Sequence, residues 1–219
     1  MKKLILIAII LSIFMFSFNG PIKMPINNKF ISYDYHYDTQ ELKNAQTFHF
    51  YGYDFSKTVL VNTKKIGEEY KEPQFWADMV YLTDKLLQAK TIKKWFEFNN
   101  VNNHQFEYNG NFEGNMKNWI TNKPQYFSAD TIQSMLLDSK KLIKENEGIG
   151  YIVYVETFDK RREQVYVVNV FFDIATMQPL IICRNWAPAD GMGFAKHWAV
   201  GIVRSVKQYN KLSFSKFIR

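Results

Sequence analysis

Three strand-like segments in succession constrain the fold of this chain more than any other feature. Residues 151–157 (YIVYVET), 164–174 (QVYVVNVFFDI) and 179–186 (PLIICRNW) are rich in Val, Ile, Tyr and Phe, which favour pleated, half-buried surfaces. The connections between them, DKRR and ATMQ, are short and polar. Because short connections join neighbouring strands, the pattern predicts an antiparallel meander of three strands.

Amphipathic helices are expected in addition to these strands. The first runs over residues 73–88 and starts at Pro73, the second follows Ser128 as its N-cap, and the third covers residues 194–211. The expected buried positions are Phe75, Met79, Leu82 and Leu86, flanked by Trp76, Val80 and Leu87, in the first helix; Ile132, Met135, Leu136, Leu142 and Ile143 in the second; and Phe194, Trp198, Ile202, Val206 and Tyr209 in the third.

The overall expectation is one α+β domain. Residues 46–62 (QTFHFYGYDFSKTVLVN) indicate two further strands around a Tyr-Asp-Phe-Ser turn. With the meander and the helices, they predict a mainly antiparallel sheet on which two to three helices pack. We expect this single domain to span residues 46–211, preceded by an arm or linker, residues 21–45, and followed by a basic tail, residues 212–219. The length of 219 residues suits one domain plus a leader.

The first 20 residues have the pattern of a targeting segment. Lys2 and Lys3 precede the uncharged run of residues 4–18, LILIAIILSIFMFSF. This run has the length of a signal-peptide core and is shorter than the roughly 20 residues of a membrane span. No A-x-A cleavage motif follows, and no cysteine stands where a lipid could be attached. We therefore expect export to the periplasm or cell envelope, with a cleaved signal peptide or an uncleaved N-terminal anchor, but not a lipoprotein.

The charge of the chain indicates the kind of partner to expect. Its net charge is +7. Export argues against nucleic acid and favours an envelope protein, an anionic polymer or a membrane surface. Basic residues interleaved with Leu and Phe near the C-terminus are the candidate contact surface, and an ordinary solvated terminus is the alternative. These residues are Arg204, Lys207, Lys211, Lys216 and Arg219. Nothing in the sequence indicates the oligomeric state.

The sequence Ala-Asp-Gly-Met-Gly before the last helix is the candidate ligand-binding turn. Gly191 and Gly193 let the backbone turn from strand to helix, and Asp190 is placed to cap that helix. Amides at a helix N-terminus can hold an anion, although this turn is neither a P-loop nor a G-x-G-x-x-G motif. If the protein is a hydrolase, Asp173, Asp190 and His197 are the catalytic candidates. His197 has no nucleophile at a recognisable spacing, so a packing role is the alternative.

Other residues of chemical interest favour structural roles. No H-E-x-x-H, C-x-x-C, G-x-S-x-G or EF-hand motif is present. Cys183 is the only cysteine and lies in an apolar run, which predicts a buried, inert thiol. Glu156, Asp159 and Asp173 lie near strand ends, where a pair of carboxylates could form a hydrolytic site. Hairpin-end acids are common, so the pattern alone does not predict one.

The histidines give no metal motif either. Asp34, His36 and Asp38 share one face of an extended segment, but three ligands from one short strand rarely converge, so a solvated arm or an edge strand is the favoured interpretation. His49 alternates with two phenylalanines and is assigned a structural role, and His104 lies in an Asn- and Gly-rich loop and is expected to be exposed. We therefore expect no metal and no cofactor.

Four short segments within residues 46–210 carry a resemblance: YGYDFSKTVLVN, ETFDK, FFDIATMQPL and GMGFAKHWA. They resemble a group of small exported bacterial envelope proteins of unknown function, which have a Y-G-x-D-F-S strand, a V-F-F-D-I-x-T-x-x-x-L segment, a Gly-rich turn and an F-x-x-x-W-A helix. The resemblance implies an α+β domain with helices on a sheet, and it supplies no catalytic residue. At residues 189–193 this chain has fewer glycines than the group.

These features favour one function and leave one alternative. We expect a non-enzymatic binding or assembly-associated domain of the cell envelope. The alternative is a small-ligand-binding protein or hydrolase that uses the turn between Asp190 and Gly193.

Overall fold

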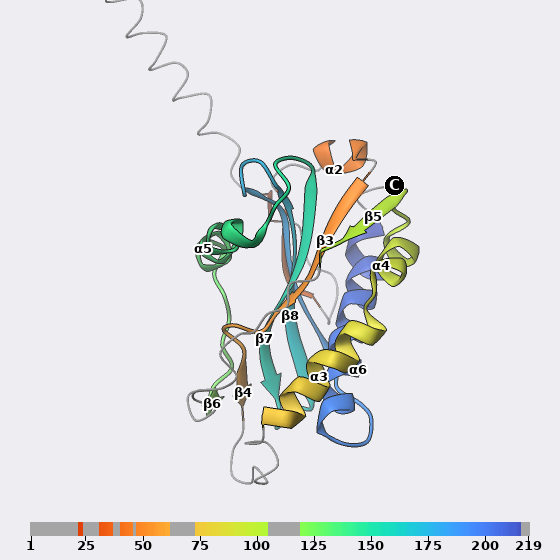
Figure 1. Ribbon diagram of the computed structural model, residues 1–219. Helices are drawn as coiled ribbons and strands as arrows, with labels where there is room; N and C mark the ends of the chain where they lie inside the picture. Colours follow the sequence, from red (N-terminus) through yellow and green to blue (C-terminus); the bar gives the residue numbers. More distant parts are fainter. Residues whose placement is uncertain are drawn as a thin grey trace, which may run out of the picture.

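The computed structural model describes residues 22–23, 31–36, 40–45, 47–61, 73–104 and 119–215. A sheet lies at the centre, with helices on both of its faces (Figure 1). The elements are, in chain order, β1 (Ile22–Lys23), β2 (Ile31–His36), α2 (Gln40–Asn44), β3 (Thr47–Asp54), β4 (Val59–Val61), α3 (Pro73–Leu86), α4 (Ala89–Phe96), β5 (Asn100–Asn103), β6 (Ile120–Thr121), α5 (Ala129–Ser139), η3 (Lys140–Leu142), β7 (Ile149–Asp159), β8 (Gln164–Asp173), β9 (Pro179–Pro188), α6 (Phe194–Tyr209) and η4 (Asn210–Phe214).

The sheet is mixed, with two halves that meet at β7. On one side, β7, β8, β9 and β2 pair with antiparallel neighbours, so the three C-terminal strands form the meander that their short connections predict. On the other side, β3, β4, β5, β6 and β7 pair with one another only in parallel. The predicted α+β class with a mainly antiparallel sheet is therefore wrong, and the fold is α/β. Parallel pairing needs long crossover connections, and the segments that contain α3, α4 and α5 supply them.

Strands β3 and β4 continue one another along β7 and do not form a hairpin. β3 lies beside residues 149–154 of β7, and β4 lies beside residues 157–159. Between β3 and β4 the chain does not pair with β7. In this break the Asp54 carboxylate accepts a hydrogen bond from the Ser56 amide at 2.6 Å. The Thr58 hydroxyl donates to the Val155 carbonyl at 2.7 Å. These side chains satisfy backbone groups at the break, so the two strands stay aligned.

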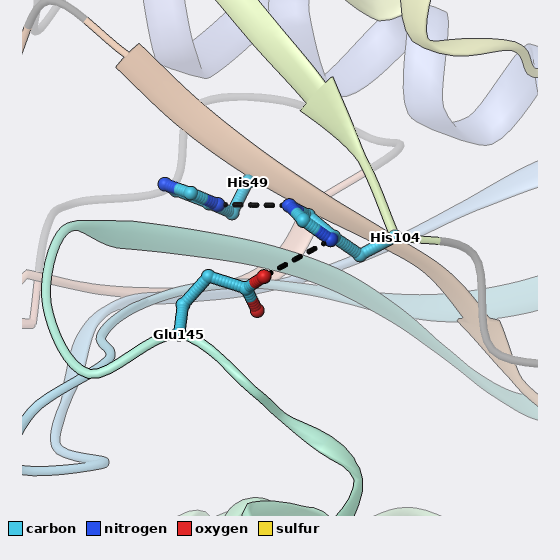
Figure 2. A group of neighbouring side chains, drawn as sticks. All are labelled: His49, His104 and Glu145. Carbon is cyan, nitrogen blue, oxygen red and sulfur yellow. Dashed lines mark hydrogen bonds and ion pairs between the residues drawn. The ribbon is translucent and has the colours of Figure 1, made fainter.

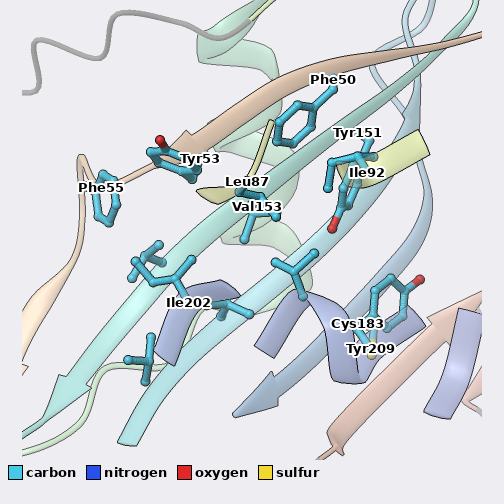
Figure 3. Packing of buried hydrophobic residues seen from close by; sticks show 14 of the residues in the cluster. Phe50, Tyr53, Phe55, Leu87, Ile92, Tyr151, Val153, Cys183, Ile202 and Tyr209 are labelled. Carbon is cyan, nitrogen blue, oxygen red and sulfur yellow. The ribbon is translucent and has the colours of Figure 1, made fainter. Parts of the chain in front are cut away.

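Two hydrophobic cores lie on opposite faces of the sheet. The helices α3, α4 and α6 cover the larger one, and α5 covers the smaller one (Figure 1). Figure 3 shows part of the larger core, with Phe50, Tyr151, Cys183 and Ile202 contributed by three strands and α6. β7 is buried at every position, as expected of a strand that is covered on both faces.

Several local predictions are confirmed. The expected stripe of α6 is buried along its whole length, and Trp198 is 0 % exposed. Cys183 is also 0 % exposed. The Ser128 hydroxyl caps α5 by accepting a hydrogen bond from the Thr131 amide at 3.1 Å.

Other local predictions need correction. The helix expected over residues 73–88 is α3, which starts at Pro73 as expected and ends at Leu86, but Leu86 itself is 41 % exposed. Trp76 and Met79 are buried as expected, Thr83 is buried beside them, and the side chain of Phe75 lies outside the described residues. Leu142, expected on the buried face of the α5 helix, lies in η3 and is 45 % exposed. Both helices carry apolar residues on more than one face, and packing against neighbouring elements selects the face that is buried.

The folded part of the chain extends beyond residues 46–211 at both ends. Residues 31–36 pair with β9, and Leu42 of α2 is 1 % exposed within the larger core. At the other end, Phe214 is 1 % exposed in the same core. The leader, Lys216 and Arg219 lie outside the described residues, as do Asp38 and the side chains of Asp34 and His36. None of the helices in the described ranges combines the length and hydropathy that crossing a bilayer requires.

Candidate metal centre

Three side chains from distant parts of the chain converge at the end of the sheet: His49, His104 and Glu145 (Figure 2). His49 lies on β3 and alternates with Phe48 and Phe50, which face the larger core, so its imidazole points to the opposite face. β5 pairs in parallel with β3, and His104 follows directly after β5. Glu145 lies in the loop between η3 and β7. Strand pairing and one loop therefore bring the three side chains together.

The polar atoms of these residues form a chain of contacts. His49 Nδ1 lies 2.9 Å from His104 Nε2, and His104 Nδ1 lies 3.2 Å from Glu145 Oε1. One nitrogen or oxygen from each residue can be chosen so that all three lie within 4.8 Å of one another. The two imidazoles are stacked, with 5.0 Å between ring centroids and 19° between planes. All three side chains are half-buried, which leaves the group accessible to solvent.

Two neighbours support this group. The Tyr51 hydroxyl donates a hydrogen bond to Glu145 Oε2 at 2.9 Å, and its ring stacks on His104 at 5.3 Å between centroids. Tyr51 is itself only 1 % exposed. Gly148 has φ +104°, and a Cβ atom there would lie 3.3 Å from the ring of His49. A glycine at this position therefore fits both the backbone conformation and the space that His49 occupies.

The electrostatic environment favours the protonation states that bind metal. Burial, followed by the neighbouring charge of His104, lowers the pKa of His49. Burial acts to raise the pKa of Glu145, but the hydrogen bond from Tyr51 and the two imidazoles outweigh it, and the net pKa is lowered. Burial and the nearby Glu145 carboxylate raise the pKa of Tyr51, so its hydroxyl stays protonated and can donate. At neutral pH the centre thus presents a neutral His49 imidazole and a carboxylate.

The donor set matches that of a transition-metal site. Zinc binds imidazole nitrogen at about 2.0–2.1 Å and carboxylate oxygen at about 2.0–2.2 Å, so ligand atoms of one tetrahedral ion lie roughly 3.3–3.5 Å apart. The 2.9 Å between the two histidine nitrogens is close to this separation. The two imidazoles therefore present nitrogens at a separation that suits one ion, with the Glu145 carboxylate next to His104.

The structure brings two of the three sequence-predicted catalytic candidates, Asp190 and His197, near one another and keeps the third, Asp173, apart from them. Asp173 ends β8, where it accepts a hydrogen bond from the Thr176 amide at 2.6 Å and so stabilises the turn into β9. Asp190 and His197 follow the other end of β9, where the Asp190 amide donates a hydrogen bond to the His197 backbone carbonyl at 3.1 Å. A strand of this length spans about 30 Å at roughly 3.3 Å per residue, so Asp173 cannot form a hydrogen bond with either of them.

The turn before α6 has a structural explanation. Gly191 and Gly193 have φ +119° and +81°, conformations that favour glycine. The N-cap of α6 is Gly193, with no side-chain hydrogen bond, so the prediction that Asp190 caps the helix is wrong. Asp190 instead accepts a hydrogen bond from Arg204 at 2.7 Å, while His197 packs edge-to-face against Trp198.

The strand-end acids do not form a pair of carboxylates. Glu156 is buried and binds the guanidinium of Arg184, with Nε and Oε2 2.6 Å apart, and also accepts from the Phe127 amide. Asp159 accepts a hydrogen bond from Arg161 at 3.2 Å. Each acid therefore neutralises an arginine.

The basic residues of the expected contact surface have different surroundings. Arg204 pairs with Asp190, and Lys207 lies over the ring of Trp95, 5.9 Å from its centroid. Lys211 is exposed and borders a pocket of about 590 Å³ formed by α2, α4 and η4. A role for these residues at a membrane or polymer surface stays a prediction.

Comparison of the chain with protein-family models, curated proteins and solved structures finds no significant match. The resemblance to exported bacterial envelope proteins therefore stays a prediction from the four motifs.

Proposed function

We propose that this protein is an exported, non-enzymatic binding protein for a divalent transition-metal ion, with zinc as the best match. The observation that supports metal binding is the convergence of His49, His104 and Glu145, whose ligand atoms lie within 4.8 Å of one another. Export is supported by the leader and by the resemblance to envelope proteins.

The ligand types support a transition metal. Calcium and magnesium take oxygen ligands, whereas imidazole nitrogen suits zinc, copper, nickel and iron. A non-enzymatic role is supported by the lack of a recognised catalytic motif in the sequence, and two pockets of about 590 and 610 Å³ are lined by residues other than those of the metal centre. The centre therefore does not share these pockets as a substrate cleft.

The test is calorimetric titration of Zn²⁺ into metal-free protein. We expect one ion per chain, and an affinity at least 100-fold lower in His104→Ala, because this half-exposed side chain supplies a ligand without filling the core. His197→Ala changes a histidine elsewhere, and Glu147→Gln changes an exposed acid in the same loop, so both controls should bind like the wild type. Circular dichroism checks that each variant is folded.

Two outcomes would contradict metal binding at this site: no measurable heat with the wild type, or unchanged affinity in folded His104→Ala. The export part has a separate test. Cell fractionation followed by N-terminal sequencing of the native protein should find it outside the cytoplasm. Recovery only from the cytoplasm would reject export without affecting the metal centre.

A further inference from the structure

We infer that Glu145 positions His104 and does not bind the ion, so that two histidines hold the metal and its remaining coordination positions stay open for transfer. This inference rests on the proposed function, because it assigns roles within the same centre. Such a site can take up and release its metal, whereas a structural zinc site, in which the protein supplies all four ligands, retains it.

The contacts of Glu145 support the positioning role. Its Oε1 lies 3.2 Å from His104 Nδ1, and its Oε2 accepts the hydrogen bond from the Tyr51 hydroxyl. Both carboxylate oxygens thus already have partners, and the nitrogen that Glu145 contacts is the one farther from His49. A carboxylate that binds the second nitrogen of a metal-binding histidine is a common arrangement, and it fixes the tautomer and orientation of the ring.

The hydrogen-bond roles follow from the ionised carboxylate. An ionised Glu145 can only accept, so His104 Nδ1 carries a proton and donates it. In neutral His104 the other nitrogen, Nε2, then has a free lone pair, and His49 Nδ1 donates to it across 2.9 Å. An ion that enters between these two nitrogens replaces the shared proton. His49 stays neutral if that proton moves to its Nε2, so no net proton is released and Glu145 need not move.

The ligand count determines how the site can be used. Structural zinc sites have four protein ligands, and an ion held by two histidines keeps about two positions for water or for donor atoms of another molecule. Among the described residues, His49, His104 and Glu145 are the only such group of His, Cys, Asp and Glu side chains. An ion with open positions can be passed on by ligand exchange, so we expect fast release to a competing chelator.

Tyr51 is a second positioning residue in this arrangement. It is buried, donates to Glu145 and stacks on His104, so it restrains the two side chains together. Tyr51→Phe keeps the ring and removes only the donor. We therefore expect a smaller loss of zinc affinity than in a variant that lacks the carboxylate.

The experiment compares Glu145→Gln, Glu145→Ala and Tyr51→Phe by Zn²⁺ titration and by the visible absorption spectrum of bound Co²⁺. A glutamine oxygen can still accept the His104 Nδ1 proton, so Glu145→Gln should bind within about tenfold of the wild type, whereas Glu145→Ala should lose roughly 10–100-fold. The Co²⁺ spectrum should be the same in the wild type and Glu145→Gln, because the set of ligands is unchanged.

The outcomes separate the two proposals. If Glu145→Gln binds as weakly as His104→Ala, or if its Co²⁺ spectrum changes, the carboxylate is a ligand and the positioning role is rejected, while the metal site stands. If the wild type binds neither ion, the proposed function itself fails. Slow loss of zinc to the chelator 4-(2-pyridylazo)resorcinol, with Glu145→Gln still binding, would reject the transfer role.

Discussion

At the scale of single residues, the centre depends on how each side chain is surrounded. His49 and Tyr51 are two positions apart on β3, so they point to the same face of the sheet, where His104 stacks against both rings. Gly148 leaves room beside His49, and Glu145 approaches from the loop that also contains this glycine. Aromatic stacking and the Tyr51 hydrogen bond hold the imidazoles near one another before any ion is present.

The lowered pKa of His49 makes the stability of the metal-free protein depend on pH. An ordinary histidine pKa of about 6.5 applies in the unfolded chain. As the pH falls below this value, the unfolded chain takes up the proton first. The free energy of unfolding should therefore decrease from about pH 6.5 down through the lower pKa of folded His49. Burial also lowers the pKa of His197, which contributes in the same direction.

Urea denaturation of the metal-free protein between about pH 7.5 and 5.5 measures this dependence. We expect His49→Gln to have a smaller loss of stability over this interval than the wild type, because one of the two shifted histidines is absent. Glu145 titrates below the interval and should not contribute to the difference. An equal pH dependence in the two proteins would show that the folded environment of His49 does not disfavour its charged form.

At the scale of elements, close contact between α6 and the sheet depends on a glycine. A Cβ atom at Gly201 would lie 2.6 Å from Val165 Cγ2 of β8 and 3.2 Å from the Ala189 backbone. The helix therefore approaches β8 more closely than an alanine would allow, and this keeps Trp198 and Ile202 in the larger core.

Gly201→Ala tests this contact. In a helix free of such contacts, the change would stabilise by about 1 kcal/mol through helix propensity. Here we expect a destabilisation of about 1–3 kcal/mol, because overpacking forces the helix or Val165 to move. Denaturant unfolding gives the difference, and Val165→Ala in the same chain should relieve part of it. A stabilised Gly201→Ala would mean that α6 lies farther from β8.

Local patterns predicted the elements well and their arrangement less well. The α6 stripe, the Ser128 cap and the burial of Cys183 each depend on neighbours within one segment, so the sequence contains the signal. Whether two strands pair in parallel or antiparallel depends on the connection between them. The strand–helix–strand order of residues 47–159 was the one feature of the sequence that could have predicted the parallel part of the sheet. The candidate metal centre was not predicted because its three residues are far apart in the sequence, and the parallel register of β3 and β5, together with a loop, brings them together.

At the scale of the whole molecule, the candidate metal centre joins side chains from three segments that are far apart in the sequence. His49, His104 and Glu145 belong to β3, to the residue after β5 and to the loop before β7. An ion bound only in the folded state stabilises that state by mass action. The chain should therefore be more resistant to unfolding when the centre is loaded.

Thermal unfolding with and without zinc tests this coupling. At a free Zn²⁺ concentration 100 times the Kd, the stabilisation should be about 2.7 kcal/mol, seen as a higher Tm in differential scanning calorimetry. The shift should be absent in His104→Ala and present in Glu147→Gln. A similar rise in both variants would indicate that zinc binds elsewhere on the chain.

The pairing of β2 with β9 has a consequence for the order in which the protein matures. β2 comes early in the chain, but its hydrogen-bonding partner is a strand made only after most of the chain has been synthesised. Until β9 emerges, the sheet lacks both the meander and the strand against which β2 pairs. When the chain is delivered from its N-terminus, by a ribosome or through a translocation channel, the sheet therefore stays incomplete until β9 has been delivered. We expect the chain to remain unfolded, and able to pass through a channel, until that point.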